Sequence, residues 1–133
     1  MATNSAASVA RTSHHQMIHY LRKSISFADA GTTVEVGTIP AGALILYPIS
    51  GVNVNVAFDG DTTNTLDLGV TGTLEKYAGD LALGTVAFVP MDVSTAVRVT
   101  STDETIQAVV VSTASAAAGT AEIVIAFIPD NDG

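Results

Sequence analysis

Three histidines, the side chains best suited to proton transfer and metal binding, lie near the start of this 133-residue chain: His14, His15 and His19. Ser13 precedes His14, but adjacency in sequence supplies neither a positioned acid nor an oxyanion hole. His15 and His19 would share one face of a helix, yet no cysteine or carboxylate lies nearby to complete a metal site. The sequence therefore predicts no catalytic group, metal or cofactor here, and the histidines are interpreted as polar residues that contact a partner.

Acidic side chains gather in a second segment, where Asp59, Asp61, Asn64 and Asp67 follow one another closely. Calcium prefers such oxygen ligands, but the calcium-loop template requires Gly at its sixth position and Glu at its twelfth. This chain has Asn64 and Val70 at those positions. We therefore expect an acidic hairpin tip, and a weak ion site held between subunits stays open as the alternative.

Aromatic residues that could stack on a sugar ring are few. The chain has no Trp and three tyrosines, Tyr20, Tyr47 and Tyr77. Tyr47 falls in a segment typical of a buried strand, whereas Tyr77 lies in residues 71–84, the least strand-like part of the sequence. We expect this part to form a surface loop that holds at most a single helical turn. Because binding residues are common on loops, Tyr77 is a candidate contact residue.

The elements that must position these residues are predicted to be β-strands. Val, Ile and Thr together account for 42 of the 133 residues. Such β-branched side chains lose χ1 freedom in a helix and pack well on a pleated sheet. The length favours a single domain with a real hydrophobic core, so the absence of cysteine is no obstacle to folding.

Charge is unevenly distributed along the chain. The formal net charge is −8, which argues against nucleic acid as a partner because phosphate binding requires clustered Lys and Arg. Residues 1–28 contain Arg11, Arg22 and Lys23 and no acidic residue, whereas the rest of the chain has two basic and thirteen acidic residues. This pattern indicates a basic arm attached to an acidic body.

Neither a membrane nor a secretory route is expected. No stretch approaches the roughly 18 apolar residues of a membrane helix. The first residues also lack the apolar core of a secretory signal. Residues 1–16 are small and polar and are predicted to form a flexible N-terminal arm, followed by one β-sandwich domain over 17–133.

Short β-branched and apolar runs separated by turn residues predict the strands of the sandwich. Residues 52–58 and 65–70 are predicted to pair as a hairpin closed by a turn at 59–61. A change of parity at Tyr20–Leu21 predicts either a bulge in the first strand or the point where the arm joins the sheet. The other predicted strands are residues 17–27, 33–36, 43–49, 85–89, 96–100, 105–113 and 120–128. The last two are apolar on both faces, so we expect them at the centre of a sheet or beneath a partner subunit. The expected fold class is all-β, a jelly-roll-like β-sandwich of about eight strands with an extended N-terminal arm.

Three consecutive segments carry a resemblance to a known class of proteins. They are I-P-A-G-A-L-I at residues 39–45, the alternating strand at 52–58, and T-N-T-L-D-L-G at residues 63–69. Together they resemble the small decoration (cement) proteins of tailed-bacteriophage capsids and related head-associated β-proteins. The resemblance implies a jelly-roll-like, trimeric protein that sits at symmetry axes of the capsid and clamps neighbouring capsomers. It carries over no individual functional residue, because these proteins have no catalytic motif.

The expected function is therefore structural: a virion protein, made in the host cytoplasm, that binds the outside of the assembled head. Its expected partners are the major capsid protein and other copies of itself. A flexible basic arm can order on an acidic neighbour, so the predicted partner-binding residues are Arg11, His14, His15, His19, Arg22 and Lys23. The alternative is a head-fibre or tail-associated module that recognises host glycans through residues 71–84. An enzyme is disfavoured because all three histidines lie in or beside the arm.

Overall fold

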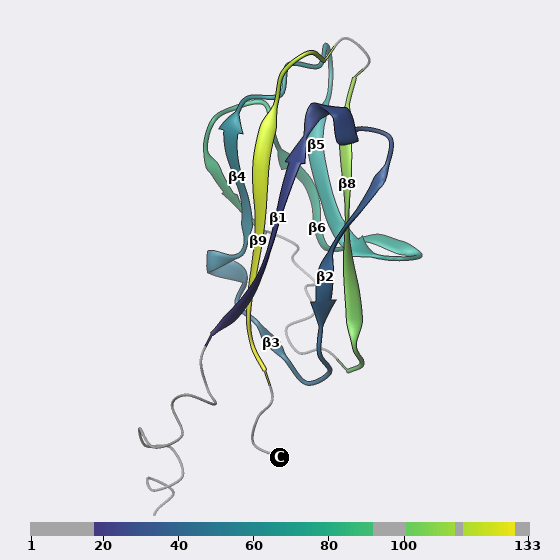
Figure 1. The fold of residues 1–133 in the computed structure, drawn as a ribbon, viewed down its shortest axis with the longest axis vertical. Helices are drawn as coiled ribbons and strands as arrows, with labels where there is room; N and C mark the ends of the chain where they lie inside the picture. The colour runs from purple at the N-terminus through teal and green to yellow at the C-terminus, as the bar shows by residue number, and fades with distance from the viewer. Residues whose placement is uncertain (1–17, 92–100, 114–115, 130–133) are drawn as a thin grey trace, which may run out of the picture.

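Two antiparallel sheets packed face to face make up the fold (Figure 1). The computed structural model describes residues 18–91, 101–113 and 116–129. Sheet A has the strand order β1 (His19–Ser26), β9 (Thr120–Ile128), β4 (Gly51–Val56) and β7 (Phe88–Pro90), and the short β3 (Leu44–Ile45) also pairs with β9. Sheet B has the order β2 (Thr33–Ile39), β8 (Glu104–Ser112), β5 (Asn64–Val70) and β6 (Thr73–Ala82). Two short 3-10 turns, η3 (Phe27–Asp29) and η4 (Tyr47–Ile49), complete the described elements.

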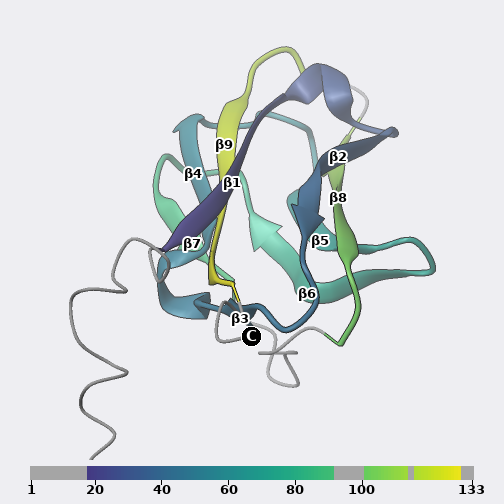
Figure 2. The ribbon, with the colours of Figure 1, turned by 60° about the horizontal axis from the view of Figure 1, so that its bottom comes forward.

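The all-β sandwich predicted from composition is confirmed. Figure 2 shows β1, β9, β4 and β7 in one layer and β2, β8, β5 and β6 in the other. This order is compatible with the jelly-roll arrangement expected above. The two strands that are apolar on both faces, β8 and β9, each have neighbours on both sides, as their sequences predict. Within the described residues, no helix is long and apolar enough to cross a membrane.

The core lies between the sheets and follows the period of two that strands impose on their side chains. Alternate residues of each central strand are almost fully buried there: Val52, Val54, Ile123 and Ile125 from sheet A, and Leu66, Leu68, Ile106 and Val110 from sheet B. Burying one such aliphatic side chain stabilises the fold by about 1.5–3 kcal/mol. The side chains on the opposite faces of both sheets are therefore the ones available for function.

The loop predicted at residues 71–84 is wrong, because most of it is the ten-residue strand β6. Its pairing with β5 contains two register shifts, between Leu66 and Leu68 and between Leu68 and Val70. Such irregularities destroy the alternation by which a strand is recognised in sequence. The buried residues Tyr77 and Leu81 nevertheless anchor β6 to the core.

The predicted hairpin between residues 52–58 and 65–70 is also wrong. β4 pairs with β9 and β7 in sheet A, whereas β5 pairs with β8 and β6 in sheet B. The connecting segment crosses from one sheet to the other, and Phe58 enters the core on the way. Asp59 then fixes this crossing, since its Oδ1 accepts hydrogen bonds from the main-chain N–H groups of Ala117 and Ala118 at 2.8 and 2.9 Å.

Strand β1 has no bulge at Tyr20–Leu21, because its register with β9 is unbroken from His19↔Phe127 to Ser26↔Thr120. The apparent change of parity arises because Ile18 and Tyr20 are apolar side chains that remain exposed. The strand predicted at 43–49 is shorter, since Pro48 lies in the turn η4 directly after β3. The predicted strand at 96–100 and the predicted arm at 1–16 lie outside the described residues.

Candidate partner-binding surface

One surface available for binding is the side of sheet A that points away from the core. Ile25 of β1 points into the core, so Tyr20, Arg22 and Ser24 point outward. The register places Glu122 of β9 between Ser24 of β1 and Asn53 of β4. We call this surface the outer face of sheet A; its described residues are Tyr20, Arg22, Ser24, Asn53, Asn55, Val56, Phe88, Thr120, Glu122 and Val124.

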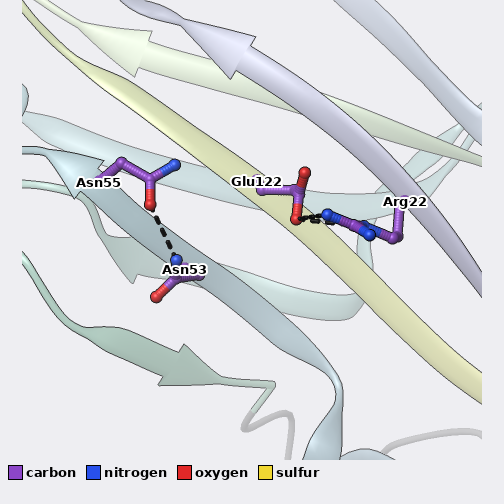
Figure 3. Close-up of polar contacts among 4 residues, drawn as sticks. All are labelled: Arg22, Asn53, Asn55 and Glu122. Carbon is purple, nitrogen blue, oxygen red and sulfur yellow. Dashed lines mark hydrogen bonds and ion pairs between the residues drawn. The ribbon is translucent and has the colours of Figure 1, made fainter.

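Polar side chains occupy the middle of this face (Figure 3). The Arg22 guanidinium donates from Nη2 and Nε to Oε1 of Glu122, at 2.5 and 3.1 Å. On the neighbouring strand, the amide Nδ2 of Asn53 donates to Oδ1 of Asn55 at 2.9 Å. The centre of the face therefore carries one positive charge, one negative charge and two amides.

Large apolar side chains lie on the same face around this polar centre. Tyr20, opposite Ala126, is 59% exposed, and Phe88, opposite Asn53, is 45% exposed. Val56 is exposed as well. These exposed side chains lie outside the core, and aromatic residues and arginine are both enriched at protein interfaces.

The two sheets differ in charge. The strands of sheet A contain two basic residues, Arg22 and Lys23, and one acidic residue, Glu122. The strands of sheet B contain one basic residue, Lys76, and five acidic ones: Glu35, Asp67, Glu75, Asp80 and Glu104. Among the residues of the strands, the acidic ones therefore lie mainly on sheet B.

The predicted partner-binding residues of β1 do not form one basic patch. Arg22 is on the outer face and pairs with Glu122. Lys23 has the opposite parity and is exposed, and His19 stacks on Phe127 with ring centroids 5.9 Å apart and an interplanar angle of 28°. Strand alternation separates neighbouring residues in this way. The other three predicted residues, Arg11, His14 and His15, lie outside the described residues.

Tyr77, the predicted contact residue for a glycan, is buried, with 1% of its surface exposed. Its hydroxyl donates to the Glu104 carboxylate, which also pairs with Lys76 Nζ. This prediction is wrong because its loop is a strand. Tyr47 is buried, as predicted.

The acidic segment predicted as a hairpin tip is divided by the fold. Asn64 exchanges hydrogen bonds with the main chain of Gly60, and Asp59 caps the crossing loop described above. Asp67 instead lies beside Glu75 and Asp80, with carboxylate oxygens of the three within 4.8 Å of one another. Sequence reasoning missed this group because two of its members are in the segment expected to be a loop.

An open depression of about 350 Å³ lies on the outer side of sheet B. It is lined by Gly31, Thr32, Thr33, Leu74, Val109, Val110, Val111 and Ser112. These lining residues include no charged and no aromatic side chain.

The start of strand β1 and the end of strand β9 lie side by side at one end of the sandwich. His19 at the start of β1 lies opposite Phe127, and β9 ends at the next residue, Ile128. Leu44 of β3 lies opposite Ile128, and both Leu44 and Ile18 are exposed. We call this region, formed by Ile18, His19, Leu44 and Ile128, the terminal end.

No protein-family model matches the sequence, and no curated protein matches it either. Among solved structures, the fold is similar to a chain of the cyanophage Pam1 capsid asymmetric unit. The TM-score is 0.63 with 20% sequence identity, and the match covers 86% of each chain. At this identity, the likeness shows a shared fold.

Proposed function

We propose that this protein is a structural, non-enzymatic virion protein that decorates the outside of an assembled phage head and bridges subunits of the major capsid protein. One observation carries the proposal: over 86% of both chains, the fold matches a chain of a phage capsid asymmetric unit. The sequence resemblance to decoration proteins, carried by three segments within residues 39–69, points to the same class independently. The protein would then be found on the outer surface of the virion.

Such a protein stabilises the shell by mass action. It binds the assembled lattice and not the separate capsid subunits, so each bound copy lowers the free energy of the lattice alone. At a free concentration of 100 times the dissociation constant, this effect amounts to about 2.7 kcal/mol per site.

The terminal end and the basic segment that precedes it are the part of the protein that would face the shell. Arg11, His14, His15, His19 and Lys23 would supply positive charge and hydrogen-bond donors toward an acidic capsid surface. Exposed Ile18 and Leu44 at the same end would add apolar contact. Arg22 contributes less to this attraction, because Glu122 already offsets its charge.

The structure does not support the alternative hypothesis that the protein is a head-fibre or tail module that recognises glycans through residues 71–84. That alternative required residues 71–84 to be an exposed loop that presents Tyr77. These residues mostly form strand β6, and Tyr77 is buried. Structural decoration is therefore the better-supported proposal.

The experiment is co-sedimentation with expanded heads that lack the protein, taken from the phage that encodes the chain. The full chain should co-sediment and should raise the temperature at which the heads disrupt. A variant that lacks residues 1–16 should keep the same thermal unfolding transition and bind at least about tenfold more weakly, a loss of about 1.4 kcal/mol. Failure of the full chain to bind would reject decoration, whereas unchanged binding of the shortened chain would reject only the role of the leading segment.

A variant with substituted residues, in place of deleted ones, tests whether the charge of the leading segment or its length matters for binding. A full-length variant with Arg11→Gln, His14→Gln and His15→Gln keeps the chain length and removes the positive charge of Arg11 and the two imidazole groups. Its binding to heads should be weaker and less dependent on salt concentration than that of the wild type, because screening acts on the charges that were removed. Equal binding and equal salt dependence would show that these residues do not contact the shell.

A further inference from the structure

The outer face of sheet A has exposed aromatic side chains that nothing in the described part of the chain covers. Tyr20 and Phe88 lie on it together with Val56, on three different strands. A sheet face that stays in water normally presents polar residues at such positions. Together with the central Arg22–Glu122 pair, this composition matches the apolar and aromatic core of a protein interface.

From this composition and from the charges, we infer that the outer face of sheet A is the surface through which one copy of this chain packs against a second copy. Each chain carries a net charge of −8, so copies repel one another in general. Contact through the outer side of sheet B would bring two sets of four carboxylates together, those of Glu35, Asp67, Glu75 and Asp80. On the outer face of sheet A the single acidic residue, Glu122, is balanced by Arg22, so contact there avoids this repulsion.

The centre of the face is complementary to itself. Arg22 and Glu122 lie side by side, so a two-fold axis that lies in the interface and runs perpendicular to the line between them places the arginine of each copy near the glutamate of the other. This two-fold contact differs from the trimer that the resemblance implies. The amides of Asn53 and Asn55 can each donate and accept hydrogen bonds, which suits the same operation. An acidic shell surface would oppose Arg22 equally well but would be repelled by Glu122. The second copy is therefore the partner that satisfies both charges.

The location of this face is consistent with simultaneous binding to a shell. The basic leading residues enter β1 at the terminal end, whereas Arg22, Glu122 and Phe88 lie along the length of the sheet. Copies that stand on a shell through the terminal end would present their sheet faces sideways to one another. The inference does not depend on the proposed function, since self-association is measured on the purified protein alone.

The first test is sedimentation velocity on the purified full chain and on two charged substitutions. Phe88→Asp places a carboxylate on the outer face of sheet A, and Leu74→Asp places one on sheet B at a similarly exposed position, 45% against 42%. The wild type and Leu74→Asp should self-associate equally, and Phe88→Asp should do so at least tenfold more weakly. A wild type that stays monomeric at every concentration, or a Phe88→Asp variant that associates normally, would overturn the inference.

The second test exchanges charges between copies. Arg22→Glu and Glu122→Arg should each associate more weakly with themselves, because like charges then face each other. An equimolar mixture of the two should form a mixed complex in native mass spectrometry, because opposite charges face each other across the interface. Each variant should first show the unfolding transition of the wild type. If the wild type associates but the mixed complex does not form, the charge pair lies outside the interface and the assignment of this face is wrong.

Discussion

Arg22 and Glu122 meet across strands β1 and β9, with the guanidinium Nη2 2.5 Å from the carboxylate Oε1. They are diagonal neighbours, since Arg22 is opposite Val124 and Glu122 is opposite Ser24. A hundred residues separate them in sequence. Among the described residues of the outer face of sheet A, Arg22 and Glu122 are the charged ones. Their charges cancel, so this face is nearly neutral although the protein is acidic.

The Arg22–Glu122 pair should matter little for folding. Both side chains are partly in water, and exposed ion pairs typically contribute no more than about 1 kcal/mol. We expect Glu122→Gln to lower the free energy of unfolding by less than that amount in urea titrations, with Ser24→Ala as the control on the same face. A loss larger than about 2 kcal/mol would mean that the pair supports the sheet itself, which would weaken the case for an interface role.

Gly119 should be far less tolerant of substitution. Its φ is +145°, and a Cβ at this position would lie 2.6 Å from Cγ of the buried Phe58. Gly119→Ala therefore combines backbone strain with a clash in a packed core, and it should cost about 2–4 kcal/mol. Gly72→Ala is the matched control, because Gly72 also has a positive φ, +86°, but nothing lies within 4 Å of its Cβ position. Equal losses from the two would show that the Phe58 ring moves aside freely.

Uninterrupted alternation explains which parts of the fold were predictable. Val52 and Val54 on β4 alternate with asparagines, which predicts a strand with one buried face. The runs of apolar residues in β8 and β9 predict strands with a neighbour on each side. The pairing of β4 was not predictable, because closeness in sequence favoured β5 as its partner, whereas its partners are β9 and β7. Strand β6 was missed because register shifts and the positive φ of Asp80 interrupt its pattern.

The candidate surface was predictable in part for a related reason. Charge segregation in the sequence identified Arg22, Lys23 and His19 as candidates, but only the strand geometry shows that Arg22 lies on the opposite side of β1 from His19 and Lys23. Glu122 carried no signal in the sequence, because its partner is remote. Exposed Tyr20 and Phe88 resembled ordinary apolar strand residues until the sheet assigned each of them to a face.

Tyr77 and Glu104 should be coupled energetically. The buried Tyr77 hydroxyl donates to the Glu104 carboxylate, which Lys76 also contacts. A hydrogen bond to a charged group contributes about 1.5–3 kcal/mol, so Tyr77→Phe should lower the free energy of unfolding by this amount. Combined with Glu104→Gln, the loss should be smaller than the sum of the two single losses, as a double-mutant cycle would measure. Additive losses would show that the hydroxyl and the carboxylate do not interact in solution. As a control, Tyr20→Phe removes an exposed tyrosine hydroxyl and should change the free energy of unfolding little.

Asp80→Asn should stabilise the protein. The carboxylates of Asp67, Glu75 and Asp80 lie within 4.8 Å of one another, and like charges at this spacing in water repel by about 1 kcal/mol. Asn also tolerates the positive φ of 54° at this position. We expect a gain of about 0.5–1 kcal/mol at neutral pH and low salt that shrinks in high salt as the charges are screened. As a control, Glu35→Gln removes a charge from sheet B outside the cluster and should show no such gain. If Asp80→Asn lowers the stability instead, the repulsion among the three carboxylates is already offset by other interactions.

Asp59 should make the stability of the protein depend on pH in the acid range. Its carboxylate accepts hydrogen bonds from the N–H groups of Ala117 and Ala118, and these lower the pKa of Asp59 below its usual value of 3.8. A pKa that is lower in the folded state means that the unfolded state takes up its proton first. The stabilisation is therefore complete above the usual value and disappears as the pH falls through the lowered pKa.

Asp59→Asn keeps an acceptor oxygen at this loop crossing but removes the charge that strengthens both hydrogen bonds. The variant should be less stable than the wild type at neutral pH, and the two unfolding midpoints should converge as the pH falls below 3.8. Asp61→Asn, a change of the same kind two residues away, should follow the wild type at every pH if Asp59 alone ties the loops together. A difference between wild type and Asp59→Asn that stays constant down to the acid limit would mean that the side chain acts by shape and not by charge.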